Sequence, residues 1–205
     1  ELGGLKQDQA VLIHSGAGGV GIMANRIAKC FNAFTIGTIG SAAKMDLLEK
    51  EGFDGKIVRS KSFAKDLKEQ LAGRDLNLIV ETIGGKIFKA GYAQLAPQGR
   101  MVVVGASQFA SPGAIPNYPR LIWQMITRPK LDPQQMIQDN KSVMGFNLIW
   151  LYEQVDMMHE MLKQMSALDL GKPHVGTTFK FDEMHYAIKL FQSGKSTGKV
   201  VVKIK

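Results

Sequence analysis

Three glycines in a short turn are the residues of this chain best suited to binding a phosphate group. Gly16, Gly18 and Gly21 fit the pattern G-x-G-x-x-G. They stand between an apolar run at 10–14 and a helical pattern at 20–31. In that context the first glycine permits a tight turn, the second lets the backbone approach a pyrophosphate, and the third lets helix and strand pack closely. The pattern predicts a dinucleotide-binding loop at the start of a helix, with a glycine-rich turn that binds nothing as the alternative.

The residues after the second expected strand (33–38) favour a phosphorylated cofactor. A unit that binds NAD usually places Asp or Glu there to accept hydrogen bonds from the ribose hydroxyls. Here the first acid is Asp46, and Ser41 and Lys44 precede it. A hydroxyl, the amides of a helix N-terminus and an ammonium suit a 2′-phosphate, so we predict NADPH rather than NADH. The alternative is that Ser41 only caps a helix and that Lys44 is a solvated surface residue.

Short apolar runs alternate with helical patterns along most of the chain, which is typical of βαβ units. We therefore expect an α/β fold, a doubly wound parallel sheet of Rossmann type. The expected strands are 10–14, 33–38, 56–58, 76–80, 100–104 and 142–146, and the expected helices are 20–31, 41–50, 63–71, 86–95, 121–127 and 151–168. The tail, extended over 175–181 and 200–204 with a helix at 182–192, need not join that sheet.

Two sulfur-containing features are expected to be structural. Methionines recur along one face of the expected helix at 151–168, a spacing that predicts core packing rather than a cofactor site. Cys30 lies on the apolar face of its helix, so we expect an inert core residue. As the only cysteine, it excludes a disulfide framework and a multi-cysteine zinc site built from this chain alone.

Composition and charge limit the classes of protein to which this chain could belong. The chain has 205 residues, of which 45% are hydrophobic, which is enough for a sizeable core. No apolar run approaches the roughly 18 residues that a membrane helix needs. The net charge is +8, but the basic residues are scattered and no aromatic residues interleave with them, so we expect no nucleic-acid partner. Because residues 1–6 lack the apolar stretch of a signal peptide, we expect a cytoplasmic protein.

Several segments together resemble one enzyme superfamily. They are 12–21, 81–85, 97–105 and 194–202. This combination resembles the coenzyme-binding part of zinc-free medium-chain dehydrogenases/reductases, the quinone oxidoreductase-like group. The segment 140–148 is most similar to the branch that contains the synaptic vesicle membrane protein.

The resemblance implies an activity, a cofactor and partners. It implies an NADPH-dependent, zinc-independent oxidoreductase that transfers hydride to a small-molecule substrate, a quinone or an α,β-unsaturated carbonyl. Enoyl reductase domains of polyketide and fatty-acid synthases share the loop, Lys44 and the later Gly-Lys-Val pattern, so they are one alternative. A non-catalytic nucleotide-binding scaffold is another. Dimers joined through a sheet edge are usual in the family, and the apolar edge near 142–148 predicts a homodimer here.

The resemblance also implies roles for single residues. Arg59 lies where relatives place a further contact to the adenosine phosphate, and Phe146 and Asn147 match a segment that borders the nicotinamide. Small residues after a strand would leave room for that ring. The expected cofactor contacts are Gly16, Ala17, Gly18, Gly19, Val20, Gly21, Ser41, Lys44, Arg59, Thr82, Gly105, Ala106, Phe146 and Asn147.

The position of the glycine loop near residue 16 implies the domain organisation. Members of the resembled family carry a GroES-like catalytic domain before the loop, and the resemblance therefore implies that these residues are the coenzyme-binding portion without that domain. We expect a dinucleotide-binding domain at 1–166 and a C-terminal segment at 167–205 that would return to the missing domain. Catalytic residues contributed by that domain cannot be named, and no metal ligand is expected among these residues.

Overall fold

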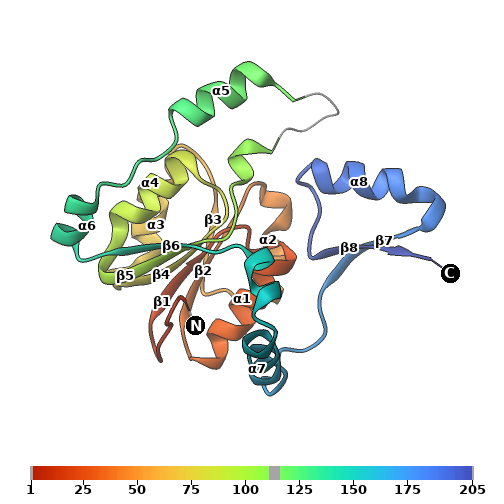
Figure 1. Ribbon diagram of the computed structural model, residues 1–205, viewed down its shortest axis with the longest axis horizontal. Coiled ribbons are helices and arrows are strands. Elements are labelled where there is room, and N and C mark those ends of the chain that lie inside the picture. The colour runs from red at the N-terminus through yellow and green to blue at the C-terminus, as the bar shows by residue number, and fades with distance from the viewer. Residues whose placement is uncertain (1, 111–115, 205) are drawn as a thin grey trace.

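Six parallel strands form the central sheet of the computed structural model, which describes residues 2–110 and 116–204 (Figure 1). The strand order is β3-β2-β1-β4-β5-β6. The strands are β1 (Ala10–Ile13), β2 (Phe34–Ile39), β3 (Gly55–Val58), β4 (Leu76–Glu81), β5 (Leu95–Val103) and β6 (Ser142–Gly145). The chain therefore starts in the middle, runs to one edge, and returns to build the other half, with its direction reversing between β1 and β4. The prediction of a doubly wound Rossmann sheet is confirmed.

Helices cover both faces of this sheet. Side chains of β1 alternate between the faces: Leu12 packs with Phe63 and Leu67 on one side, and Ile13 packs with Leu48 on the other. Burying each such side chain contributes roughly 1.5–3 kcal/mol. The covering helices are α1 (Gly19–Cys30) and α2 (Met45–Lys50) on one face, and α3 (Phe63–Leu71) and α4 (Gly85–Gln94) on the other.

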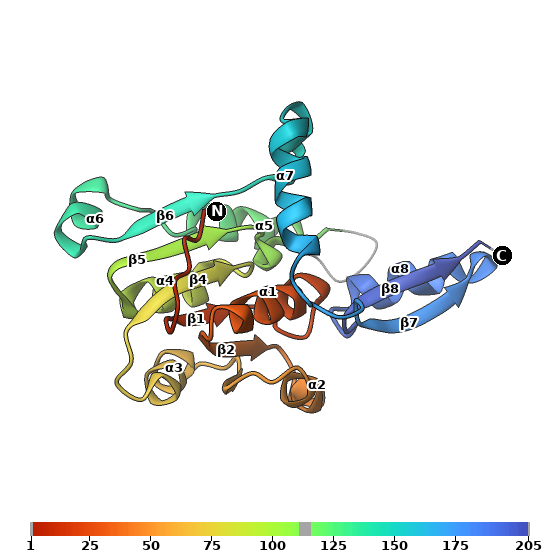
Figure 2. The same cartoon turned by 90° about the horizontal axis from the view of Figure 1, so that it is seen from below.

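The C-terminal residues form a second, smaller unit. β7 (Val175–Lys180) and β8 (Lys199–Lys203) pair in parallel as a separate two-stranded sheet, with α8 (Met184–Gln192) between them in sequence. Figure 2 shows this unit projecting from one end of the main sheet. The tail does not join the six-stranded sheet, as expected. The boundary between 1–166 and 167–205 stays a prediction, and both ranges include residues outside the described ones.

The segment between the two sheets differs from expectation. It contains η2 (Ser107–Phe109), α5 (Tyr118–Ile126), α6 (Pro133–Asp139), η3 (Leu148–Glu153) and α7 (Val155–Ser166). The single helix expected at 151–168 is wrong, because the backbone of Gln154 is not helical and separates η3 from α7. α6 was not expected. It begins with Pro133 after Asp132, whose side chain accepts a hydrogen bond from the backbone of Gln134.

Two packing expectations are also wrong. No residue of α7 is buried: of the predicted methionine face, Met165 is exposed and Met158 and Met161 are only partly buried, because this helix extends away from the sheet rather than covering it (Figure 2). Cys30 is exposed at the last residue of α1, where its thiol donates to the carbonyl of Arg26. Neither the methionines of α7 nor Cys30 belongs to the hydrophobic core of the described residues. Within residues 2–110 and 116–204, no helix has the length and apolar character needed to span a bilayer.

Candidate functional site

The glycine turn lies at the carboxyl end of β1, where the strand order reverses. The Gly16 amide donates to the Thr38 carbonyl at 2.9 Å, which anchors the turn to β2. The Gly18 amide donates to the Ser15 carbonyl at 2.8 Å, which closes the turn. Gly18 is the N-cap of α1, and no side chain caps this helix or places an acid in its first turn. The start of α1 therefore presents backbone amides and the positive end of the helix dipole to an anion.

The glycines of the turn differ in how closely other atoms approach the place of a side chain. A Cβ on Gly21 would collide with the Ser15 carbonyl oxygen and lie 2.8 Å from the Cα of Gly16. A Cβ on Gly16 would approach Gly37 and Phe53 at 3.3 Å. A Cβ on Gly18 would meet only the Ser15 carbonyl oxygen, at 3.2 Å. A side chain at Gly21 is therefore excluded by backbone atoms, while one at Gly16 or Gly18 would make a close contact, at Gly18 with the carbonyl of the turn alone.

Ser41, Lys44 and Arg59 lie beyond the carboxyl ends of β2 and β3. The Ser41 hydroxyl accepts a hydrogen bond from the Ala43 amide at 3.4 Å, so it does cap the short helix. Lys44 is half-buried, and its pKa is lowered by burial and by the charge of Arg59. Two cations without an acid between them suit a phosphate dianion.

The Lys44 ammonium already has protein partners. It donates to the carbonyl of Gly194 at 2.6 Å and to that of Ser196 at 2.8 Å. An ammonium has three protons to donate, so one is left for a phosphate. The same tail segment reaches the glycine turn, where the Gly198 amide donates to the Ala17 carbonyl at 2.8 Å. The sequence predicted none of these contacts, because nothing in a local pattern marks residues that meet across such a separation.

Tail residues also cover the start of α1. The side chain of Lys199 runs beside Gly19, where a Cβ would lie 2.9 Å from the lysine Cε. Val20, the next residue of the helix, is 60% exposed. The expected contacts Ala17, Gly19 and Val20 are thus partly covered by the tail and partly open.

Thr82, Gly105 and Ala106 gather at the carboxyl ends of β4 and β5. The Thr82 and Ser15 hydroxyls are 3.0 Å apart, which joins this edge to the glycine turn. A Cβ on Gly105 would lie 3.7 Å from Thr82, an ordinary contact distance, and both Gly105 and Ala106 are exposed. The structure therefore brings these residues to the same edge of the sheet as the glycine turn.

Phe146 and Asn147 follow the edge strand β6. The Phe146 amide donates to the Val103 carbonyl at 3.0 Å, and its ring is partly buried against the core. The Asn147 side chain accepts from the Ile149 amide at 3.2 Å, which caps η3. Both have packing or capping roles here, and their contact with a nicotinamide stays a prediction.

A buried chain of polar groups runs below the turn, and the sequence analysis did not identify it. Arg59 Nη1 donates to Thr38 Oγ1 at 3.0 Å, and Thr38 Oγ1 lies 2.8 Å from His14 Nδ1. His14 Nε2 then faces Glu81 Oε2 at 3.3 Å. Thr38, His14 and Glu81 are each at most 1% exposed. Three polar residues near the carboxyl ends of otherwise apolar strands were a signal that could have revealed this cluster.

Three members of this cluster have shifted pKa values. Burial, with the charge of Arg59, lowers the pKa of His14 to about 3, so the imidazole is neutral at physiological pH. Burial raises the pKa of Glu81, while hydrogen bonds from backbone amides and the charge of Arg59 act against that rise. The pKa of Arg59 is lowered by burial, against the attraction of Glu81.

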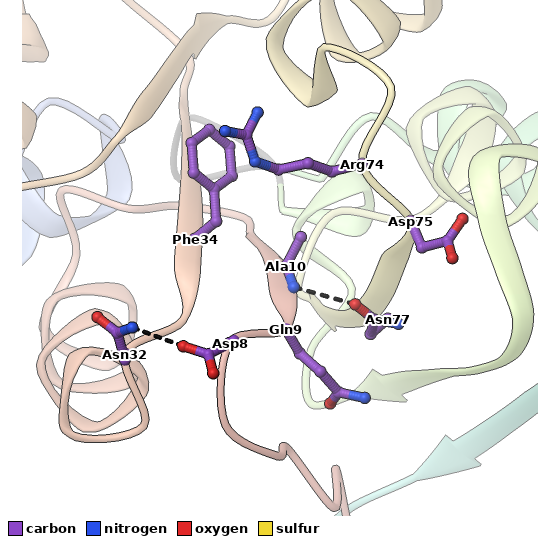
Figure 3. Close-up of a pocket in the computed structure, with 8 residues that line it drawn as sticks. All are labelled: Asp8, Gln9, Ala10, Asn32, Phe34, Arg74, Asp75 and Asn77. Carbon is purple, nitrogen blue, oxygen red and sulfur yellow. Dashed lines mark hydrogen bonds between the residues drawn. The ribbon is translucent and has the colours of Figure 1, made fainter.

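A hollow of about 460 Å³ lies at the opposite end of the sheet (Figure 3). The Arg74 guanidinium stacks over the Phe34 ring at 4.1 Å, and Asn77 accepts a hydrogen bond from the Ala10 amide at 3.0 Å. Since Ala10 begins β1 and the glycine turn follows its end, this hollow is separate from the candidate site. Among residues 2–110 and 116–204, no three His, Cys, Asp or Glu side chains gather in a way that could hold a metal ion.

Comparison with known proteins finds both similar sequences and solved structures of similar fold. The chain is 26% identical over 206 residues to a synaptic vesicle membrane protein VAT-1 homolog of Danio rerio, covering 98% of this chain and 42% of that protein. Among solved structures, a mycobacterial protein complexed with NADPH superposes with a TM-score of 0.75 at 22% identity, covering 97% of this chain and 58% of the other. The CurK enoyl reductase superposes with a TM-score of 0.75 at 25% identity, covering 98% and 56%.

The chain thus spans less than half the length of the Danio rerio relative. Because zinc ligands can lie in the part of a relative that this chain does not match, the zinc-free interpretation stays a prediction. The sequence model described as zinc-binding dehydrogenase matches residues 19–167, which is most of the chain. This match begins in the glycine turn and ends just after α7, and it covers all of the sheet beyond β1. The chain belongs to the zinc-binding dehydrogenase family and carries its coenzyme-binding part.

Proposed function

We propose that this chain binds NADPH as the coenzyme domain of a reductase that transfers hydride to a quinone or an α,β-unsaturated carbonyl. The observation that carries the proposal is the uncapped start of α1 at the point where the strand order reverses. Open α/β sheets bind ligands at that point. The mycobacterial protein of the same fold, solved with NADPH, supports this choice of cofactor.

The residues present fit the cofactor part by part. The pyrophosphate would lie against the first amides of α1, those of Gly19 and Val20, the 2′-phosphate between Lys44 and Arg59, and the nicotinamide near Thr82. Bound NADPH would supply the hydride. The chain's own contribution is to hold the cofactor, through a fixed turn and two cations, with its nicotinamide at the edge formed by β4 and β5.

A titration of NADPH into matched glycine variants tests the pyrophosphate site. In Gly18→Ala the new methyl would lie 3.2 Å from the Ser15 carbonyl oxygen, so the turn must shift by a few tenths of an ångström, and it would stand beside the place assigned to the pyrophosphate. We expect NADPH affinity to fall by about tenfold or more, a cost of roughly 1.4 kcal/mol. Gly145→Ala is the control, because a Cβ there meets nothing within 4 Å. Unchanged NADPH affinity in Gly18→Ala would contradict the assignment.

The second candidate is the enoyl reductase module of a synthase, which is favoured by the likeness to the CurK enoyl reductase. Its reaction type and cofactor are the same, but its substrate is an acyl chain held on a carrier protein. The two candidates therefore differ in what surrounds this chain. Carrier or ketoreductase sequence flanking it in the gene product would favour the synthase module, and an isolated two-domain protein would favour the quinone or enone reductase.

A further inference from the structure

The buried polar chain has a direction that follows from its donors. A guanidinium can only donate, so Thr38 Oγ1 accepts from Arg59, and its own proton is available to His14 Nδ1. When the hydroxyl donates, His14 Nδ1 is the acceptor and the single proton of the neutral imidazole lies on Nε2; the hydroxyl's second lone pair also permits the opposite tautomer, which the first experiment below distinguishes. Nε2 lies 3.3 Å from Glu81 Oε2, a contact without the geometry of a hydrogen bond, and among the described residues neither of these two buried atoms has a hydrogen-bond partner.

Glu81 holds the loop that follows β4. Its other oxygen, Oε1, accepts from the Ile83 amide at 2.5 Å and from the Gly84 amide at 2.8 Å. The same loop binds the next one, because Ser107 and Gln108 donate their amides to the carbonyls of Thr82 and Ile83 at 2.9 Å. One buried carboxylate therefore fixes two loops on the side of the site assigned to the nicotinamide.

We propose that Glu81 is a positioning residue for the nicotinamide side, and that Thr38 and His14 couple it to Arg59 on the adenosine-phosphate side. The charge of Arg59 favours both the neutral imidazole and the carboxylate. A phosphate that binds Arg59 neutralises this charge, and the hydrogen-bond chain carries the change to the loop at 82–85. The inference rests on the proposed function, since it assumes that the 2′-phosphate of NADPH binds at Arg59.

The nitrogen-15 NMR shifts of the His14 ring test the chain, first without cofactor. We expect the tautomer with the proton on Nε2 in the wild-type chain. In Glu81→Gln, the amide oxygen must still accept from the backbone, so its NH2 group faces His14 and the proton should move to Nδ1. The exposed His159 is the control ring. A wild-type proton on Nδ1 would overturn the proposed direction.

Adding cofactor to the same sample tests the coupling. NADPH should shift the His14 resonances, whereas NADH, which lacks the 2′-phosphate, should shift them little. Thr38→Val removes the hydroxyl at nearly constant shape and should abolish the NADPH-specific shift, and Thr38→Ser, which keeps the hydroxyl, should retain it. Equal responses to the two cofactors, or a shift that survives in Thr38→Val, would contradict the coupling.

A double-mutant cycle measures the coupling as affinity. Arg59→Ala and Glu81→Gln should each weaken NADPH binding, and together by less than the product of the two factors, with a discrepancy of about threefold or more. Lys44→Ala combined with Glu81→Gln should be multiplicative, since Lys44 is outside the chain of bonds. If NADPH does not bind the wild-type chain at all, the proposed function and the coupling both fail, and the wild-type tautomer still decides the direction of the bonds.

Discussion

Lys44 Nζ lies 2.6 Å from the carbonyl oxygen of Gly194, a residue 150 positions further along the chain. The ammonium thus joins the helix after β2 to the tail, while the same side chain stands where a 2′-phosphate is expected. The ammonium of Lys44 would therefore serve both the contact with the tail and the contact with the phosphate. Phosphate binding and the position of the tail are therefore linked through Lys44.

Lys44→Ala should weaken NADPH binding by about tenfold, because one charge-assisted hydrogen bond contributes roughly 1.5–3 kcal/mol. NADH binding should change little, since NADH has no phosphate at that position. Titrations of both cofactors measure this, with Lys50→Ala as a control at an exposed position of α2, the helix that Lys44 precedes. Hydrogen exchange at 194–199 should accelerate in Lys44→Ala alone. Equal losses for NADPH and NADH would remove Lys44 from the phosphate site.

We expect a homodimer formed by pairing of β6 with its symmetry mate, because β6 is an edge strand of the sheet. The Phe146 amide faces β5, so strand alternation directs the Gly145 amide outward. Gly145→Pro should block the new pairing without removing a bond to β5. Light scattering should give twice the 22.5 kDa chain mass for wild type and the single mass for the variant. A wild-type mass of one chain at micromolar concentration would refute the dimer.

Acid should destabilise the chain through His14. Its pKa falls from 6.5 to about 3 on folding, so between these values the unfolded chain binds a proton that the folded chain does not. The free energy of unfolding therefore decreases as the pH falls from 6.5 toward 3, by up to about 1.4 kcal/mol per pH unit from this group. Glu81, whose pKa is raised, opposes the effect by taking up its proton more readily when folded.

Denaturant unfolding across this pH range isolates the contribution of His14. The curve for His14→Gln should fall less steeply with acid than the wild-type curve, and the curve for the exposed His159→Gln should follow wild type. Parallel curves for wild type and His14→Gln would show that the imidazole does not stay neutral in the folded chain.

The chain should bind NADPH yet oxidise it slowly when a simple quinone is added. The chain spans only part of the length of its relatives, and a cleft between two domains would be needed to hold the reactants in reactive geometry. The segment 167–205 should also exchange its amide protons faster than the sheet. A steady-state assay and hydrogen exchange measure the two effects. Rapid turnover of NADPH with quinone, or slow exchange throughout the tail, would contradict this prediction.

Local pattern was sufficient for the elements that carry their own signals. The helix at 63–71 was predicted with the bounds that the structure gives, because Phe63, Leu67 and Leu71 repeat at helical spacing and are buried together. The long helix through 151–168 failed for the opposite reason. An apolar stretch was read as continuous with the methionine face, and Gln154 gives no sign in sequence of the non-helical backbone that interrupts it.

Some residues of the candidate site could likewise be predicted from local sequence pattern, and others could not. The glycine turn could be predicted since Gly16, Gly18 and Gly21 are adjacent in sequence and their roles depend on neighbouring backbone. The partners of Lys44 could not, because they lie 150 and 152 positions away. The buried chain from Arg59 to Glu81 joins four different strands or strand ends, and only a known strand order brings its members together.

The contact between Gly198 and Ala17 has a consequence for the order of folding. The glycine turn, α1 and β2 can form from contacts between residues close in sequence, at a small entropic cost of loop closure. The bond from the Gly198 amide to the Ala17 carbonyl must instead close a loop that encloses nearly the whole sheet. Contacts of this kind form after the local ones. We therefore expect the nucleotide turn to be native-like before the tail closes over it.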